Sequence, residues 1–422
     1  MQRADLRNII LIWLSWLIIV IGFMNLIPYR LQPDRPDHAL VWTATETTER
    51  SNINKPYLLD PFLNANVAWD SEFYLSITTV NYQDPAVAYI ITPGRSVSYA
   101  EYIESGNEGY ATSNAFFPLY PYLAKVLALP LSILGLTPIA TSTLAALIVS
   151  LLGTLIGMLA IYDICYERMG SKGALLSAFM MLIFPTSFFF ATVYTEGLFA
   201  GLSFASLALM RRNKLIPAAL LAVLATWTRA IGGLLIIPLL LSALVMLWQN
   251  RQGTLTISKK RLWLQLPFIL APLLAYAIYR VAFGQAFDFV QSHWFGNAIL
   301  EVAKSITAWD QILQRAQEVP ETAVMVALAI STIMIASLSL LYTFRFYPRV
   351  ALFSFFALFI PLTSGATGPH SIIRYVLVMP SLWIMLGALS HRWIVFEKAW
   401  TLLSLLLMAI LAYLFSVDMW VA

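Results

Sequence analysis

Long uncharged stretches of apolar residues recur along most of the chain, and polar residues gather mainly between them. The stretches are about 15 to 25 residues long, which is the length that a helix needs to cross a hydrocarbon core of about 30 Å. The pattern predicts an all-α polytopic membrane protein with about 11 transmembrane helices. They are expected at 8–28, 138–162, 174–190, 196–210, 215–229, 231–249, 263–281, 322–344, 350–364, 375–390 and 398–416.

Basic clusters on alternate connections orient these helices, because Lys and Arg accumulate in cytoplasmic loops. The clusters are Arg168 with Lys172, Arg211 with Arg212 and Lys214, Arg251 through Arg261, Arg345 with Arg349, and Arg392 with Lys398. We therefore expect a multi-pass protein of the cell membrane whose N-terminus is cytoplasmic.

Two long segments, 29–137 and 282–320, then lie outside as a large first and a second extracytoplasmic loop. Ordered loops of this length usually carry function. The apolar stretch 116–136 contains three prolines and a lysine, so we expect an interfacial helix there rather than a span. The whole chain, 1–422, is expected to form one membrane domain whose chemistry lies mainly in the outer loops.

Composition narrows the class of protein. Hydrophobic residues make up 59% of the 422 residues and charged residues 11%, against roughly 25% charged in soluble domains, so an ordinary soluble globule is excluded. A lone cysteine, Cys165, excludes an internal disulfide and a cysteine-based metal cage. The net charge of +4 is too small and scattered for a nucleic-acid surface. The first run, Ile9 to Pro28, is longer than a signal-peptide core and is expected to be a retained span.

A carboxylate flanked by aromatic residues follows the first span, in the order Trp69, Asp70, Ser71, Glu72, Phe73 and Tyr74. This arrangement suits sugar chemistry, because aromatic faces stack on sugars while a carboxylate takes a proton from an acceptor hydroxyl. Taken alone, the segment fits a solvated acid beside interface-anchoring aromatics better.

Three more charged residues fall at the outer ends of predicted spans. Glu196 lies in a turn where an acid is costly unless it is solvated or paired, and a hydrated turn is the alternative. Arg229 interrupts a long uncharged stretch and needs an anionic partner, such as Glu196, Asp70 or a phosphate. Arg374 suits bidentate binding of a phosphodiester, and the alternative is an arginine that snorkels to the interface.

Polar and aromatic residues near these charges complete the candidate binding residues. Gln291 and Trp294 offer hydrogen bonding and stacking in the second outer loop, whereas His293 beside them is more often an ordinary loop residue than a base. The other candidates are Tyr194, His370 and Tyr375. We assign no metal ligands and expect no cofactor.

Taken in order, these segments resemble the PIG-V family of mannosyltransferases, which includes the second mannosyltransferase of GPI-anchor synthesis and bacterial relatives. The similar segments are Trp69 to Tyr74, Ala115 to Pro121, Pro185 to Glu196, Thr228 to Gly232 and Ser371 to Tyr375. The resemblance extends over most of the chain.

This resemblance implies a GT-C fold and a glycosyltransferase that moves mannose from a polyprenyl-phosphate donor to a lipid or glycan acceptor outside the cytoplasm. Asp70 is then the expected catalytic base, and Arg229 and Arg374 stabilise the leaving phosphate. Such a donor needs no nucleotide-binding domain, and the sequence has neither a Rossmann fingerprint nor a P-loop.

Two other functions fit many of the same features. A transporter or flippase of a lipid-linked sugar also combines many spans with a few embedded charges, but transporters tend to show internal inverted repeats, and none is visible here. An oligosaccharide ligase or a transferase to protein would keep the fold and change the donor.

Overall fold

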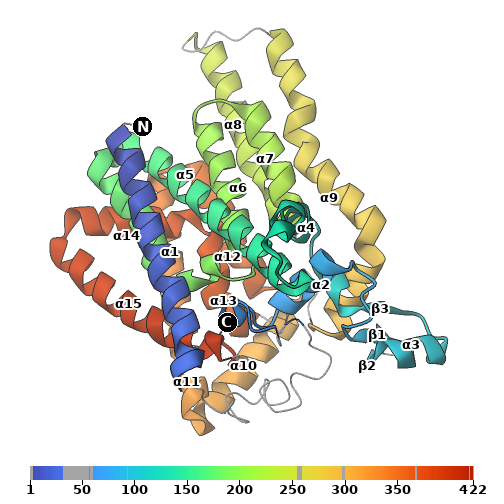
Figure 1. The fold of residues 1–422 in the computed structure, drawn as a ribbon. Helices are drawn as coiled ribbons and strands as arrows, with labels where there is room; N and C mark the ends of the chain where they lie inside the picture. The colour runs from blue at the N-terminus through green and yellow to red at the C-terminus, as the bar shows by residue number, and fades with distance from the viewer. Residues whose placement is uncertain are drawn as a thin grey trace.

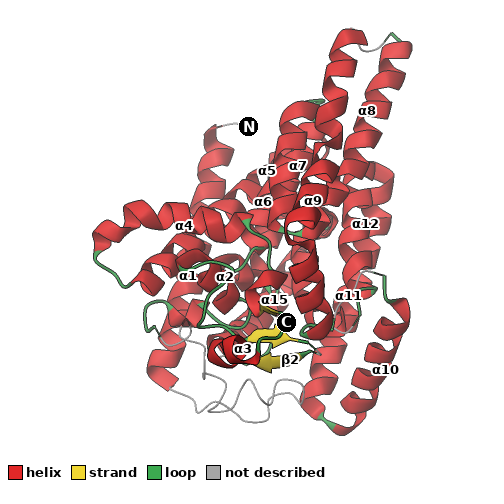
Figure 2. Ribbon diagram, turned by 90° about the vertical axis from the view of Figure 1, so that its right-hand side faces the viewer, coloured by secondary structure: helices red, strands yellow, loops and turns green. Residues whose placement is uncertain are grey.

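The computed structural model describes residues 3–31, 57, 60–92, 94–253, 259–296, 300–365, 368–417 and 419–421, and these are mostly helical (Figure 2). The α-helices are α1 Arg3–Leu31, α2 Ser71–Thr79, α3 Tyr99–Ser105, α4 Leu119–Leu131, α5 Pro138–Ile183, α6 Glu196–Arg211, α7 Leu215–Thr228, α8 Ile236–Arg251, α9 Lys259–His293, α10 Val302–Glu318, α11 Pro320–Phe346, α12 Pro348–Leu362, α13 Gly368–Tyr375, α14 Pro380–Arg392 and α15 Ile394–Ser416. Short 3₁₀ helices are η4 Asn64–Asn66, η5 Thr112–Ala115, η6 Ser132–Leu134, η7 Ser187–Ala191, η8 Ala230–Leu235 and η9 Val376–Val378.

Six helical stretches in the described chain are long and apolar enough to cross a membrane, which supports the predicted multi-pass membrane protein. They are Arg3–Ile27, Pro138–Ile183, Ala230–Arg251, Leu264–His293, Pro320–Phe346 and Ile394–Ser416. A seventh is possible if Ser371–Val378 and Pro380–Arg392, which meet at a bend of 81°, form one broken span.

The number of 11 spans and their orientation stay predictions. Helices α6, α7, α12 and α14 have 16, 14, 15 and 13 residues, and at about 1.5 Å per residue each is shorter than a hydrocarbon core of about 30 Å. The expected spans 138–162 and 174–190 both fall within or next to α5, which is interrupted at Gly170, where φ is 65°. The second expected outer loop, 282–320, contains the last turns of α9 and all of α10.

The described part of the predicted first outer loop contains a small sheet. Its three strands, β1 Tyr89–Ile91, β2 Arg95–Val97 and β3 Gly109–Ala111, pair antiparallel in the order β2-β1-β3. The apolar stretch 116–136 contains helix α4 and η6, and its place at the membrane interface stays a prediction. The strands and α10 lie at one end of the molecule, while the start of α1, the end of α8 and the start of α9 lie toward the other (Figures 1 and 2).

Small residues let α5 and α6 approach closely, and this approach holds the first turn of α6 in place. A Cβ atom on Gly201 would lie 2.4 Å from the carbonyl oxygen of Gly153, and one on Gly197 would lie 2.2 Å from that of Ser150. Within a membrane, helices associate largely through such close packing of small residues. Glu196, next to Gly197, is therefore held against α5.

We expect Gly201→Ala and Gly22→Ala to change stability in opposite directions. Alanine in a helix is favoured over glycine by about 0.5–1 kcal/mol, and nothing lies within 4 Å of a Cβ on Gly22. At Gly201 the added methyl group forces α5 and α6 apart, at a cost of about 1–3 kcal/mol. Thermal unfolding in detergent should show a lower midpoint for Gly201→Ala and an unchanged or higher one for Gly22→Ala. Equal midpoints would contradict the close packing.

Candidate functional site

Two hydrogen bonds join the segment before α2 to the segment before α6, and Asp70 and Glu196 follow these segments directly. The side-chain amide of Asn66 donates to the carbonyl of Ala191 at 2.8 Å, and the Val193 N–H donates to the carbonyl of Asn66 at 3.1 Å. Asn25 of α1 in turn donates to the Asn66 side chain at 2.8 Å. Two segments more than a hundred residues apart in sequence therefore run side by side.

Trp69 adopts a backbone conformation that is rare for a non-glycine residue, with φ at 54°. Its ring meets Trp420 edge to face at 4.8 Å, and its Nε1–H donates to the carbonyl of Met419 at 3.3 Å. This strained turn directly precedes Asp70, which is the N-cap residue of α2 but makes no capping hydrogen bond with its side chain. Unusual backbone conformations of this kind gather at functional sites, where the surrounding contacts hold them.

Asp70 is paired with Arg374. Arg374 Nη1 donates to Asp70 Oδ2 at 2.9 Å, and the Arg374 side chain is only 5% exposed. The hydroxyl of Tyr194 accepts from the backbone N–H of Asp70 at 3.2 Å and donates to the carbonyl of Ala68. Asp70, at the start of α2, is thus held through its backbone N–H by Tyr194 and through its carboxylate by Arg374.

Glu196 lies between the two arginines. Its Oε1 accepts from Arg229 Nη1 at 2.7 Å and is 3.6 Å from Arg374 Nε, and its side chain is 2% exposed. The four charges therefore form a chain, Asp70 to Arg374 to Glu196 to Arg229, which we call the charge chain. Its positive and negative charges balance. A buried ion pair needs this balance, because an unpaired buried charge is very costly.

Aromatic rings surround the two guanidinium groups. The Arg374 Cζ lies 5.1 Å from the ring centre of Tyr194, 5.5 Å from Phe189 and 5.3 Å from Tyr375. Tyr375 also faces Arg229, at 5.4 Å. These distances are typical of cation–π contacts, which hold a cation without neutralising it.

Two buried polar atoms of the charge chain have no hydrogen-bond partner among the described residues, Glu196 Oε2 and Arg374 Nε. Buried polar atoms are nearly always satisfied, so each is a place where a ligand or a water molecule can bind. Tyr74 lies beside them: burial first, and then the charges of Asp70 and Glu196, raise its pKa, so its hydroxyl stays protonated and can donate. No group of three His, Cys, Asp or Glu in the described chain could hold a metal ion.

The other predicted binding residues lie around or away from this cluster. Gln291 Nε2 donates to the carbonyl of Ala115 at 3.2 Å. His293 stacks on Phe289 and is exposed, and Trp294 is 41% exposed. Glu72 is buried in the first turn of α2. The side chain of His370, in α13, lies outside the described residues.

Sequence reasoning missed the residues that position the charges. Asn66 carries the fastening to Ala191, and the Thr186 hydroxyl donates to the carbonyl of Ile373 at 2.6 Å, next to Arg374. Asn66 stands in no recognisable motif, and Thr186 lies within the segment Pro185 to Glu196 but was not singled out. The only signal for Asn66 is that two amides, Asn64 and Asn66, interrupt the apolar stretch just before Trp69.

No family model and no curated protein matches this chain. Among solved structures, the apo oligosaccharyltransferase of Archaeoglobus fulgidus is similar at 13% identity, with a TM-score of 0.42. The match covers 97% of this chain and 56% of the archaeal one, so the chain spans little more than half the length of that protein. ArnT from Cupriavidus metallidurans bound to undecaprenyl phosphate is similar at 13% identity and a TM-score of 0.43, over 84% of this chain and 72% of that one. TM-scores below 0.5 assign neither fold nor activity, so a function has to come from the site itself.

Glu196→Gln should destabilise the protein strongly, because it removes the carboxylate that Arg229 and Arg374 share. Loss of one partner from a buried ion pair costs about 3–5 kcal/mol. Asp288→Asn is the control, since Asp288 pairs with Arg280 on the surface and such pairs contribute about 0–1 kcal/mol. Thermal unfolding in detergent should show a clear loss only for Glu196→Gln, and a loss equal to that of Asp288→Asn would mean that the charge chain does not stabilise the fold.

Proposed function

We propose that the protein is a glycosyltransferase of the GT-C type that moves a hexose, mannose, from a polyprenyl-phosphate-linked donor to a lipid or glycan acceptor on the extracytoplasmic side. The observation that carries this proposal is the charge chain. It places a carboxylate that can accept a proton beside a guanidinium group that can bind a phosphate, joined directly at 2.9 Å.

In the ligand-free protein each charge is already satisfied by its neighbour. A donor phosphodiester carries one negative charge and competes with Asp70 and Glu196 for Arg374, whose planar group can bind two oxygens at once. When Arg374 turns to the phosphate, the Asp70 carboxylate no longer shares its charge and is free to accept a proton. Donor binding therefore increases the ability of Asp70 to accept a proton.

The transfer itself is a single displacement. The acceptor hydroxyl oxygen forms a bond to the anomeric carbon of the donor sugar and loses its proton to Asp70. The bond between the anomeric carbon and the phosphate oxygen breaks, and its electron pair stays on that oxygen. The lipid phosphate thereby gains one negative charge, which Arg374 and Arg229 stabilise. Charges placed in advance where charge develops are usually the largest source of rate enhancement.

The choice of mannose and of a PIG-V-like enzyme rests on the resemblance of five segments of the sequence. Four of these five segments meet in the site. Trp69 to Tyr74 supplies Asp70, and the later segments supply Glu196, Arg229 and Arg374. The remaining segment, Ala115 to Pro121, packs against the first: Phe116 stacks on Phe73 at 4.9 Å.

Asp70→Asn should leave the protein folded, because Arg374 keeps Glu196 as a partner, but should lower turnover by roughly two orders of magnitude or more. The assay is transfer of labelled mannose from polyprenyl-phosphate-mannose to a panel of membrane lipids and glycans. Asp288→Asn on the surface is the matched control and should retain most activity, and Glu72→Gln, two residues from Asp70, tests the nearest alternative base. Near-normal turnover in Asp70→Asn removes it as the base. Labelled sugar that crosses vesicle membranes without transfer favours a transporter instead.

The predicted orientation can be tested by thiol labelling of intact cells. The native Cys165 is buried, so it leaves a low background. Cysteines introduced at the exposed residues Ser105 and Gln252 should behave oppositely: an impermeant reagent should label Ser105→Cys outside and miss Gln252→Cys until the membrane is permeabilised. Labelling of Gln252→Cys in intact cells would reverse the orientation.

A further inference from the structure

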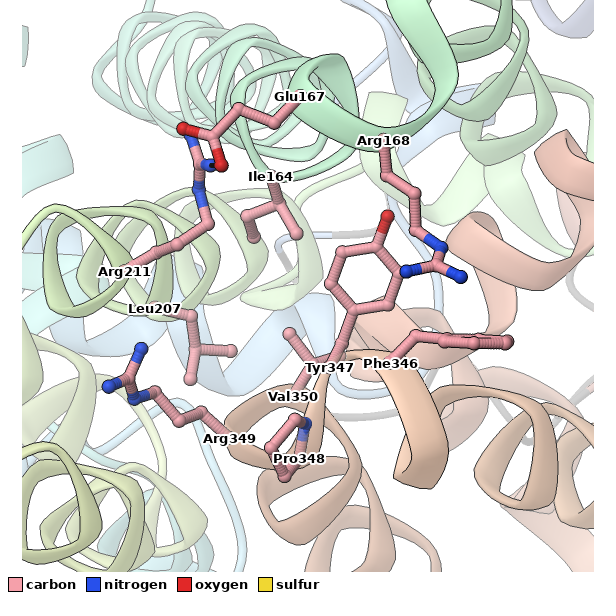
Figure 3. Close-up of a pocket in the computed structure, with 10 residues that line it drawn as sticks. All are labelled: Ile164, Glu167, Arg168, Leu207, Arg211, Phe346, Tyr347, Pro348, Arg349 and Val350. Atoms are coloured by element: carbon pink, nitrogen blue, oxygen red, sulfur yellow. Dashed lines mark ion pairs between the residues drawn. The ribbon is translucent and has the colours of Figure 1, made fainter. Parts of the chain in front are cut away.

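A cavity of about 270 Å³ lies far from the charge chain (Figure 3). Arg211, the last residue of α6, lines it, whereas Glu196 is the first residue of the same helix. Fifteen residue steps at 1.5 Å each place the two ends of α6 about 22 Å apart. The cavity is therefore separate from the proposed active site and lies at the end that we predict to be cytoplasmic.

Residues from four helices, α5, α6, α11 and α12, and from the junction between the last two form the cavity. Its floor is apolar and comprises Ile164, Leu207 and Val350, all buried. Its other lining residues are Glu167, Arg168, Arg211, Phe346, Tyr347, Pro348 and Arg349. Three arginines thus face a single glutamate, so the lining carries an excess of positive charge.

Two of the arginines have no acidic partner in the described part of the chain. Arg211 is paired with Glu167 and Asp163. Arg168 instead lies over the ring of Phe346, at 3.7 Å, and half-buried Arg349 has no ion pair among the described residues. Figure 3 shows Arg168 and Arg349 on either side of Tyr347. Both cations are available to an anion.

Tyr347 adds a donor that also lacks a partner. Its hydroxyl is buried and has no hydrogen-bond partner among the described residues. A buried hydroxyl without a partner costs free energy, and a ligand oxygen in the cavity would recover it. Two cations and a hydroxyl donor can bind a phosphate, and the apolar floor can contact an apolar group attached to it. The cavity therefore suits a phosphate ester that carries an apolar group.

We propose that this cavity binds a phosphate anion, either the headgroup of an anionic membrane lipid or a soluble phosphate compound. The surface beside it favours access from lipid, because Leu341 and Phe344 are 73% and 66% exposed on the last turns of α11, which ends at Phe346 in the cavity wall. Basic residues at a cytoplasmic membrane surface attract anionic lipids.

The test uses the full chain in detergent and measures retained lipid by native mass spectrometry, with phosphatidylglycerol and phosphatidylcholine as probes. The wild-type protein should retain phosphatidylglycerol selectively. The double variant Arg168→Gln/Arg349→Gln should bind it at least about tenfold more weakly, because both unpaired cations are lost. The matched control is Arg345→Gln/Arg392→Gln, which removes the same charge from two exposed residues outside the cavity and should bind like wild type.

Tyr347→Phe keeps the packing and removes only the hydroxyl, so it tests the cavity even if the double variant misfolds. It should leave the ligand-free unfolding midpoint unchanged or raised and should bind phosphatidylglycerol several-fold more weakly. Inorganic phosphate at millimolar concentration is the second arm: if it stabilises wild type but not the double variant, the ligand is a soluble phosphate. Equal retention of the two lipids without an effect of phosphate, or equal losses in the double variant and its control, overturns the proposal.

Discussion

The buried pair Glu196 and Arg374, in the middle of the charge chain, is the constraint on which the rest of this structure depends. Glu196 and Arg374 are almost completely shielded from solvent, and each is tolerable only because the next residue in the charge chain neutralises it. The four residues come from the start of α2, the start of α6, the end of α7 and α13. A shift of any of these four elements would therefore leave a buried charge without its partner and lower the stability of the fold.

The scaffold around the charge chain meets this demand by close contacts. Glycines let α5 and α6 touch, so the first turn of α6 has little freedom. Asn66 binds the segment before α2 to the segment before Glu196, and the Thr186 hydroxyl holds the backbone next to Arg374. For the proposed reaction, this means that folding has already placed the charges near the position where new charge would develop.

The sequence predicted those features that follow from a local rule. Long apolar runs located α1, α11 and α15, and the cost of an acid or a base at the membrane boundary singled out Glu196, Arg229 and Arg374 as residues in need of partners. The resemblance placed Asp70 with them, and the structure brings the four together.

Other features depend on contacts that no local pattern encodes. The break within α5 lies at Gly170, which has a positive φ. Asn66 and Ala191 meet across 125 residues. One arginine from each of three basic clusters that served only to orient the chain also lines one cavity, because the part of α5 before its break at Gly170, the end of α6 and the junction of α11 and α12 meet there.

Binding of the lipid phosphate to wild type and to Asp70→Asn tests the coupling between base and phosphate most directly. If Asp70 and the phosphate compete for Arg374, removing the negative charge of Asp70 should strengthen binding of polyprenyl phosphate by about tenfold, measured by titration of the purified proteins. Arg374→Lys should weaken binding in the same titration, because a point charge cannot replace the planar fork. Equal or weaker binding of polyprenyl phosphate to folded Asp70→Asn would contradict the account, since it would show that the phosphate does not take Arg374 from the carboxylate.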